Sequence, residues 1–204
     1  MIYLHMEKTI AEKLELLKRD LYLEVAAKIF DEVGYENVTV SDLADSFDIS
    51  VGTFYKIFET KENLYFEYIL YQFRTFVERL EDNSTDDPIQ NLKLFLHYTY
   101  EPFIKNKKGK SINISLENDP FFFHNLNTND SQPMDGLYKY LAKQFEEILK
   151  NEKIDCYHTA VLFKKLADGY TQSYMIKKFD TTNVIDDTIT LFFSGIAKIS
   201  KQDI

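Results

Sequence analysis

The sequence predicts an all-α protein of about nine helices, and three observations support this fold class. Apolar residues recur at helical spacing along most of the 204-residue chain. Only 6 glycines and 4 prolines interrupt it, which suits long helices joined by short connections. A hydrophobic content of 45% is ample for a core, and the aromatic residues are Phe and Tyr alone.

The first helix is predicted over residues 7–33, ending at Gly34. Its apolar residues form a stripe of the kind that packs one face of a helix against a core. The stripe consists of Ile10, Leu14, Leu17, Leu21, Val25 and Ile29.

Two short helices follow, and their capping residues define them. Thr39 lies three residues before Asp42, so the two can exchange side-chain bonds with each other's free backbone amides. Asp48 stands where the chain must turn, at a position that needs a residue tolerant of positive φ. Ser50 can cap the next helix, Val51–Phe58. This spacing predicts a helix-turn-helix, a unit that enters the major groove of DNA.

The two faces of the helix Val51–Phe58 have different chemistry. Phe54 and Phe58 lie four residues apart and can pack inward, whereas Thr53 and Lys56 face outward toward bases and phosphates. Gly52, near the start of the helix, lets a phosphate or sugar approach the backbone closely. The outward face is therefore the predicted DNA-reading surface.

A long fourth helix is predicted over residues 61–80 after Thr60, with Glu62 in its first turn, and it would connect the reading unit to the rest of the chain. Such a helix is stiff, so a displacement at its far end would reach its start. The polar run Asn83–Pro88 ends it.

Residues 18–66 resemble the DNA-binding domain of the TetR family of bacterial transcriptional regulators. The residues that carry the resemblance are Gly52-Thr-Phe-Tyr55, Phe58 and Thr60-Lys-Glu-Asn-Leu64, which match the family's recognition helix and the entry to its fourth helix. Asp48, Val51 and Ile57 depart from the family's usual residues. The expected DNA-binding residues are Thr39, Ser41, Ser50, Val51, Gly52, Thr53, Tyr55, Lys56 and Lys61.

The resemblance implies a domain organisation. Residues 1–66 would form the DNA-binding domain, and residues 67–204 a helical domain for ligand binding and dimerisation. Periodicity predicts further helices near 89–105, 111–127, 134–151, 157–178 and 183–200.

Charge argues against strong DNA binding. The chain has a net charge of −9, and residues 1–65 carry seven basic against thirteen acidic side chains. Affinity for random DNA scales with the phosphates that cations neutralise, so we expect it to be weak. Specific binding would depend on hydroxyls, backbone amides and the pairing of half-sites by a dimer.

The last two helices carry an assembly pattern. Small residues on both, such as Ala160, Ala167 and Gly195, would let helices approach closely and form a four-helix bundle with a second copy. Filling of the monomer's own core is an equal reading of the pattern, and the resemblance favours the interface because family members dimerise there. The expected interface residues are Leu162, Leu166, Ile189, Phe192, Phe193 and Ile196.

Aromatic residues in the second half suggest a ligand cavity, which the family resemblance also implies. Phe103, Phe122, Tyr170 and Tyr174 are the candidates for its lining, and they would suit an apolar, aromatic or cationic effector. Phe121, Phe122 and Phe123 cannot all point one way on a helix, and most such aromatics are ordinary core residues.

No catalytic site, metal site or cofactor is expected. The four histidines lack metal-ligand spacing, Cys156 with His158 forms only a lone pair, and no phosphate-binding glycine loop occurs. The single cysteine, the lack of a membrane-spanning run and the lack of a signal pattern predict a cytoplasmic protein.

Together these features predict a homodimeric, ligand-responsive regulator that binds a palindromic double-stranded DNA operator and is released from it by a small effector, as a repressor would be. The alternative is a helical ligand- or protein-binding module of the same fold that does not bind DNA. The acidic N-terminal half is the feature that favours the alternative.

Overall fold

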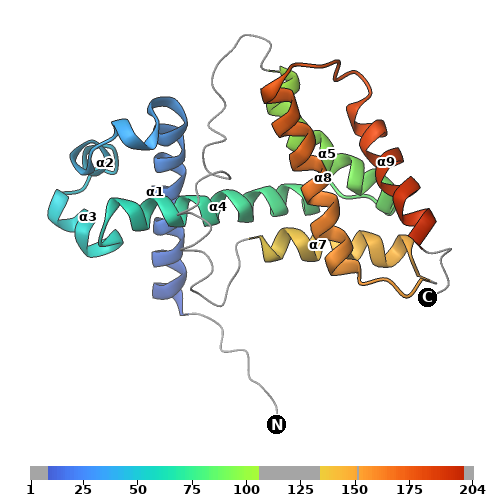
Figure 1. The fold of residues 1–204 in the computed structure, drawn as a ribbon. Coiled ribbons are helices and arrows are strands. Elements are labelled where there is room, and N and C mark those ends of the chain that lie inside the picture. Colours follow the sequence, from blue (N-terminus) through green and yellow to red (C-terminus); the bar gives the residue numbers. More distant parts are fainter. Residues whose placement is uncertain (1–8, 106–133, 151, 200–204) are drawn as a thin grey trace. The chain divides into compact units, whose positions relative to one another are not determined.

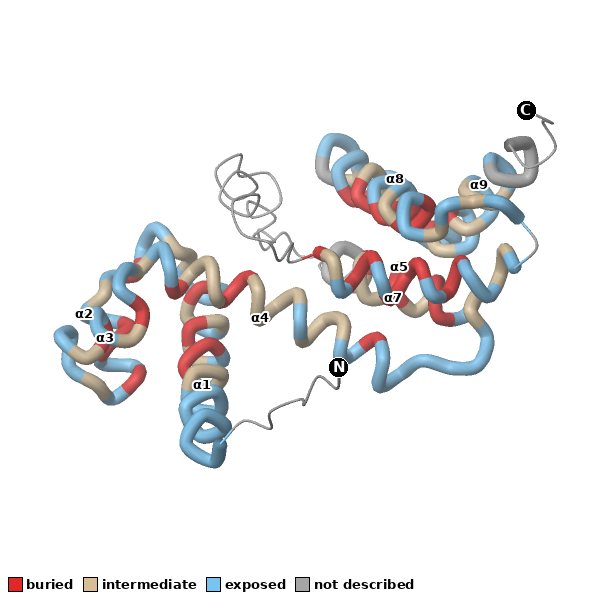
Figure 2. Tube along the Cα trace, turned by 90° about the horizontal axis from the view of Figure 1, so that it is seen from below, coloured by how far each residue is buried: buried red, intermediate tan, exposed pale blue. Residues whose placement is uncertain are grey.

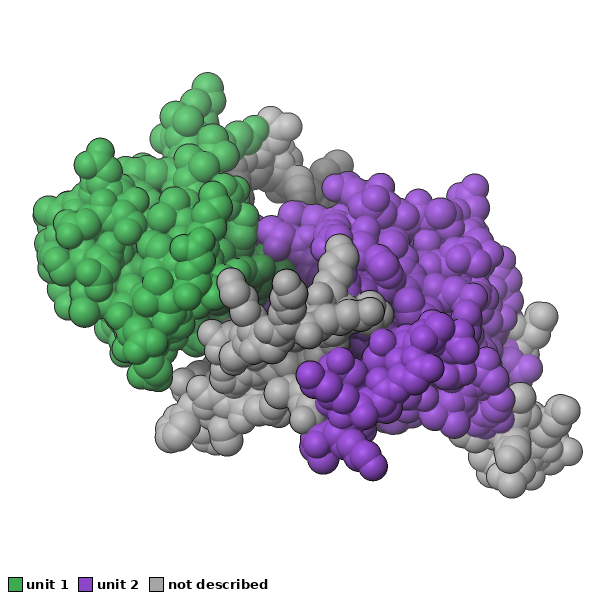
Figure 3. All heavy atoms as spheres, turned by 90° about the horizontal axis from the view of Figure 1, so that it is seen from above, with its two compact units in different colours: residues 1–72, 115–122 green, residues 73–114, 123–204 purple. Residues whose placement is uncertain are grey.

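A computed structural model describes residues 9–105, 134–150 and 152–199 of the chain (Figure 1). The chain divides into two compact units, the first built mainly on residues up to Gln72 and the second mainly on those from Phe73 onward (Figure 3). Within the described ranges every regular element is a helix, eight of them α-helices and one a 3₁₀ turn. The predicted all-α class is confirmed.

Helix α1 spans Ile10–Val33 and is closed at both ends by local bonds. Thr9 and Glu12 form a capping box, in which the Thr9 backbone amide donates to Glu12 Oε2 at 2.7 Å and the Glu12 amide donates to Thr9 Oγ1 at 3.3 Å. Gly34 ends the helix at φ 85°, a conformation that favours glycine. The predicted end at Gly34 is confirmed.

The apolar stripe of α1 is not the face that packs in unit 1. Ile10, Leu14, Leu17 and Leu21 are 79%, 60%, 58% and 52% exposed (Figure 2). Helical periodicity locates the faces of a helix but does not say which face another element covers, and the first turns of α1 lie beyond the core of unit 1. The face buried in that core consists of Tyr22, Leu23, Ala26 and Phe30.

Three short elements follow α1. They are η1 at Tyr35–Asn37, α2 at Val40–Ser46 and α3 at Val51–Phe58. The capping box of Thr39 with Asp42 is present, and Ser50 Oγ accepts the Thr53 amide at 3.1 Å. Asp48 lies in the turn at φ 55°, as its position predicted. Local side-chain bonds therefore define where α2 and α3 begin.

Aromatic rings fill the core of unit 1. Phe47 contacts Tyr22, Phe54 and Phe58 at ring-centroid distances of 5.0, 6.3 and 6.0 Å. Phe54 and Phe58 are 0% and 1% exposed, so the inner face of α3 is fully buried. This packing fixes α3 by its inner face and leaves its outer face to solvent.

Helix α4 spans Lys61–Asp82 and supplies residues to both cores. Near its start, Leu64, Tyr68 and Ile69 are buried in unit 1, where the Tyr68 hydroxyl donates to Asp31 at 2.9 Å. Near its end, Leu80 is buried in the core of unit 2. The polar run after Asp82 separates α4 from α5, as predicted.

Unit 2 contains α5 at Pro88–Lys105, α7 at Asp135–Ile148, α8 at Cys156–Ile176 and α9 at Val184–Ile199. The predicted helix at 111–127 lies outside the described residues. The core contains polar ties as well as apolar packing: Asn91 donates to Gln144 at 2.9 Å, and the Tyr100 and Thr188 hydroxyls lie 3.1 Å apart. Burial raises the pKa of Tyr100, which keeps this hydroxyl neutral.

Candidate nucleic-acid interface

The outer face of α3 presents side chains that the sequence analysis predicted to contact DNA. Tyr55 is 49% exposed and Val51 41%, and Lys56 is exposed one residue beyond Tyr55. The Tyr55 ring rests edge-on against the Phe54 ring at 5.8 Å, so a buried residue of the same helix supports it. The surface combines an aromatic hydroxyl with one ammonium group on a helix that is anchored from behind.

The first turn of α3 presents backbone as well as side chains. Ser50 Oγ lies 2.9 Å from Thr53 Oγ1, so the two hydroxyls bond to each other in the free protein. A Cβ added to Gly52 would lie 3.9 Å from Ser50 Oγ, its nearest neighbour, and the residue is exposed. The free protein therefore has room for a side chain at Gly52, and the open surface there is available to a phosphate.

Helix α2 brings two further candidates to its first turn. Thr39 and Ser41 are both exposed, but the Thr39 hydroxyl already bonds to Asp42 Oδ2 at 2.6 Å. The Thr39 hydroxyl and amide hold the pKa of Asp42 below its ordinary value. Among the described residues the Ser41 hydroxyl has no hydrogen-bond partner, so of the two it is the one available to DNA.

Lys61 is held in a contact that the sequence did not indicate. Its ammonium lies 4.1 Å from the centroid of the Tyr35 ring, a cation–π geometry, and the residue is half-buried. The Tyr35 hydroxyl donates to Glu62 at 3.1 Å. Burial, and then Glu62, raises the pKa of Tyr35 to about 12. Sequence reasoning missed Tyr35 because 26 residues separate it from Lys61, and no local pattern connects them.

The dimer candidates on α8 and α9 occupy two environments. Leu162 is 52% exposed, and together with Leu166 and Phe192 it borders an apolar groove of about 480 Å³. Leu191, which the sequence analysis did not select, lines the same groove and is 55% exposed. Phe192 also packs on Phe163 at 4.9 Å, within its own subunit.

The other interface candidates are more deeply placed or undescribed. Ile189 and Phe193 are half-buried against the core of unit 2. The small residues Ala160 and Ala167 are fully buried in that core, as the core-filling reading proposed for them. The side chain of Ile196 lies outside the described residues.

The ligand candidates surround little space. Tyr170 and Tyr174 line a cavity of about 10 Å³, and their rings pack on Phe179 at 6.2 and 5.6 Å. Such a volume holds roughly one water molecule. Phe122 and the side chain of Phe103 lie outside the described residues.

A larger groove of about 710 Å³ adjoins that cavity. Thr181 and Val184 line both spaces, so the segment between α8 and α9 separates them. The groove is polar and includes the Lys93–Asp186 ion pair, with Nζ and Oδ1 2.7 Å apart. The sequence analysis did not predict it, because its residues come from two parts of the chain, the α4–α5 connection with α5 and the distant α8–α9 connection with the start of α9.

Two kinds of feature are absent from the described residues. They contain no group of three His, Cys, Asp or Glu side chains placed to hold a metal ion. No helix among them is long and apolar enough to cross a membrane.

Comparison with known proteins supports the reading of unit 1. The sequence profile described as bacterial regulatory proteins, tetR family, matches residues 23–68. An HTH-type transcriptional regulator of Staphylococcus aureus is 33% identical over 86 residues, which is 41% of this chain and 46% of the relative. The chain thus spans less than half the length of this curated relative.

Solved structures match over most of the chain. The fatty acid degradation regulator FadR of Bacillus halodurans superposes with a TM-score of 0.60 at 17% identity, covering 91% of this chain and 96% of its own. FadR of Bacillus subtilis, solved in complex with stearoyl-CoA, gives 0.58 at 16% identity, covering 88% and 98%. At these identities the likeness shows the fold alone.

Proposed function

Because the chain belongs to the TetR family of bacterial regulatory proteins, we propose that it is a ligand-responsive, homodimeric transcriptional regulator that binds operator DNA through α3. It would act as a repressor that its effector releases. The observation that carries the proposal is the two-sided packing of α3, whose inner face is buried in aromatic rings while its outer face presents Tyr55 and Lys56 to solvent.

The proposed mode of DNA binding follows from the scarcity of cations on that face. Lys56 would contact a phosphate, and the open backbone at Gly52 would let a second phosphate approach the start of α3. Asp42, Asp45 and Asp48 are all exposed nearby in the sequence, so the net electrostatic attraction is small. Base contacts and a second subunit must therefore supply most of the affinity for an operator.

The proposed dimer uses α8 and α9. Leu162 and Leu191 are large, apolar and more than half exposed, and they border one groove. Covering them with the same surface of a second copy removes apolar area from water, which favours association. A twofold pair then presents two α3 helices to a palindromic site.

The effector we propose is small and apolar or aromatic, with a polar group. Phe179 lines the cavity at Tyr170 and Tyr174, and the larger groove shares Thr181 and Val184 with that cavity. If the segment that carries Phe179, Thr181 and Val184 moved out, the two spaces would join into one site with an aromatic end and a polar mouth. Stearoyl-CoA, the ligand of the Bacillus subtilis FadR structure, has this amphipathic character and is a rational first probe.

Selection from a random pool of DNA duplexes tests the proposed function. The purified chain should enrich a palindromic sequence, and sedimentation should show one dimer per duplex. A chain that enriches no sequence, at low salt and over a range of concentrations, would instead support the helical module without DNA binding.

A further inference from the structure

The connection between α3 and α4 is short and strained. Only Glu59 and Thr60 separate the two helices, and Glu59 adopts φ 62° and ψ −48°. The Thr60 amide donates to the Phe58 carbonyl at 2.6 Å, which closes a γ-turn of the rare positive-φ type. A non-glycine residue keeps such a conformation only where its surroundings hold it there.

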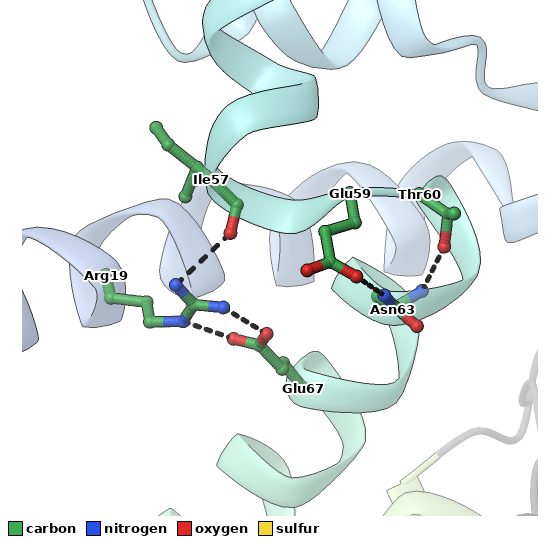
Figure 4. Close-up of polar contacts among 6 residues, drawn as sticks. All are labelled: Arg19, Ile57, Glu59, Thr60, Asn63 and Glu67. Carbon is green, nitrogen blue, oxygen red and sulfur yellow. Dashed lines mark hydrogen bonds and ion pairs between the residues drawn. The ribbon is translucent and has the colours of Figure 1, made fainter.

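Several of the bonds that hold the turn are local to α3 and α4. The Glu59 amide donates to the Tyr55 carbonyl at 3.0 Å, and the Asn63 amide donates to Thr60 Oγ1 at 3.0 Å. Asn63 Nδ2 also donates to Glu59 Oε2 at 3.4 Å (Figure 4). These bonds connect each helix end to the turn. They involve only α3, the turn and α4, so through them no other element helps to fix the angle between the two helices.

Arg19 of α1 contacts both helices and so connects them to a third element. Its Nη1 donates to the Ile57 carbonyl, in the last turn of α3, at 3.3 Å. Its Nε donates to Glu67 Oε2, on α4, at 2.6 Å, and its Nη2 bonds to the other oxygen of the same carboxylate (Figure 4). The guanidinium carbon also lies 5.2 Å from the centroid of the Phe58 ring. The Arg19 guanidinium thus binds α3 on one side of the strained turn and α4 on the other.

This set of hydrogen bonds requires a guanidinium group. Two parallel bonds to a carboxylate plus a third to a carbonyl require a fork of fixed geometry, which an ammonium lacks. The side chains of Arg19 and Glu67 are 38% and 24% exposed, so both groups are partly shielded from solvent. The bonds that Arg19 donates to Glu67 also raise the pKa of Arg19 above its ordinary value.

We propose that Arg19 is a positioning residue that sets the orientation of α3 against α4 and thereby the operator specificity of the protein. The proposal rests on the proposed DNA-binding function. Base edges in the major groove must be met at a defined helix orientation, whereas contacts to phosphates tolerate changes of angle. Loss of the Arg19 bonds should therefore weaken binding to the operator far more than binding to random DNA.

Two variants separate this role from simple electrostatics, because one leaves the net charge unchanged and the other makes it more positive. Arg19→Lys keeps the positive charge but loses the fork. Glu67→Gln removes a negative charge, which by itself would strengthen DNA binding. Arg74→Lys, at the arginine that pairs with the exposed Glu78 on α4, is the matched control.

The experiment measures the dissociation constants of each protein for the duplex that the wild type selects and for a scrambled duplex, at a temperature where circular dichroism shows full folding. We expect the ratio of the scrambled to the operator dissociation constant to fall about tenfold in Arg19→Lys and in Glu67→Gln, and by less than about twofold in Arg74→Lys. Sequences selected by the two test variants should also be less sharply defined at the bases that α3 reads.

Other outcomes overturn the proposal. If the melting temperatures fall but the ratio stays at the wild-type value, Arg19 has only a structural role. If Arg19→Lys does not fold, Glu67→Gln supplies the same comparison. A wild type that selects no DNA would overturn the proposed function as a whole, whereas selection by the wild type with unchanged ratios in the variants would overturn only the role of Arg19.

Discussion

Asp42 illustrates how a single exposed carboxylate couples the fold of unit 1 to pH. Its bonds from the Thr39 hydroxyl and amide stabilise the ionised form, which is why its pKa is lowered. A lowered folded-state pKa means that the unfolded chain binds the proton more tightly. The carboxylate therefore contributes stability above the unfolded pKa of about 4, and that contribution is lost as the pH falls through the folded value.

We predict that Asp42→Asn has a flatter stability profile in acid than the wild type. Urea unfolding followed by circular dichroism, at a series of pH values from about 6 to about 3, measures the difference. Ser46→Ala, in the last turn of the same helix, is a control without a titrating group. Parallel profiles for the wild type and Asp42→Asn would show that the Thr39–Asp42 bonds do not persist in solution.

Lys56 is the exposed cation of α3, and its removal should change the salt dependence of DNA binding. A cation that neutralises one phosphate contributes about one unit to the slope of log affinity against log salt. Lys56→Ala should therefore bind operator and random DNA more weakly and with a slope smaller by about one unit per subunit. Fluorescence anisotropy over a salt series measures both quantities, and an unchanged slope would remove Lys56 from the interface.

At the scale of elements, the turn between α3 and α4 stores strain at Glu59. Glycine adopts a positive φ without the steric penalty of about 1–3 kcal/mol that other residues meet. Its extra freedom in the unfolded chain costs about 0.5–1 kcal/mol. We predict that Glu59→Gly raises the free energy of unfolding by about 1 kcal/mol. Glu59→Ala is the control, since it removes the same side-chain bond and keeps the strain; equal stability of the two variants would contradict the prediction.

The segment between α8 and α9 contains Phe179, and the role of this ring in the cavity can be tested. Phe179 fills the space between Tyr170 and Tyr174, so Phe179→Ala should enlarge the cavity and lower the stability of the free protein by about 1–3 kcal/mol, given its partial exposure. The thermal shift produced by stearoyl-CoA should then be larger than in the wild type. Phe179→Leu, which keeps most of the bulk, is the control, and equal shifts in all three proteins would place any binding elsewhere.

What the sequence could predict follows from the distance between interacting residues. The caps at Thr39 and Ser50 and the turn at Asp48 depend on neighbours three residues away, so residue identity was enough to find them. The contacts of Arg19 with Glu67 and of Lys61 with Tyr35 join residues 48 and 26 positions apart. Nothing in the local pattern distinguishes those side chains from solvated ones.

The stripe of α1 shows a second limit. Periodicity correctly placed Ile10, Leu14, Leu17 and Leu21 on one face, but burial depends on whether another element reaches that face. In the described residues the core of unit 1 covers the neighbouring face, because Tyr22 and Phe30 carry large rings that meet Phe47, Phe58 and Tyr68. Prediction of a helix and prediction of its partner are thus separate problems.

At the scale of the whole molecule, the proposed dimer determines whether two α3 helices can read one palindrome. We predict that Leu191→Glu yields monomers, because dimerisation would bury one unpaired carboxylate from each subunit in an apolar interface. Operator affinity should fall by more than about a hundredfold, since the second half-site is lost. Analytical ultracentrifugation and anisotropy measure the two effects.

The control for the dimer is Glu146→Lys, an exposed charge change on α7 at a residue that does not line that groove. It should leave the sedimentation coefficient at the dimer value. A wild type that sediments as a monomer at micromolar concentration and still binds a palindrome tightly would contradict the proposed pairing.

The sharing of α4 between two cores limits how this chain can be divided. A fragment ending at Phe66 would lack Tyr68, whose ring packs on Phe30 and whose hydroxyl bonds to Asp31, and it would also lack Ile69. An exchange of unit 1 between chains of this fold would therefore need its crossover at or beyond Gln72, in the middle of a continuous helix rather than in a linker. Recombination in evolution meets the same constraint, so the two halves should be inherited together more often than two domains joined by a loop.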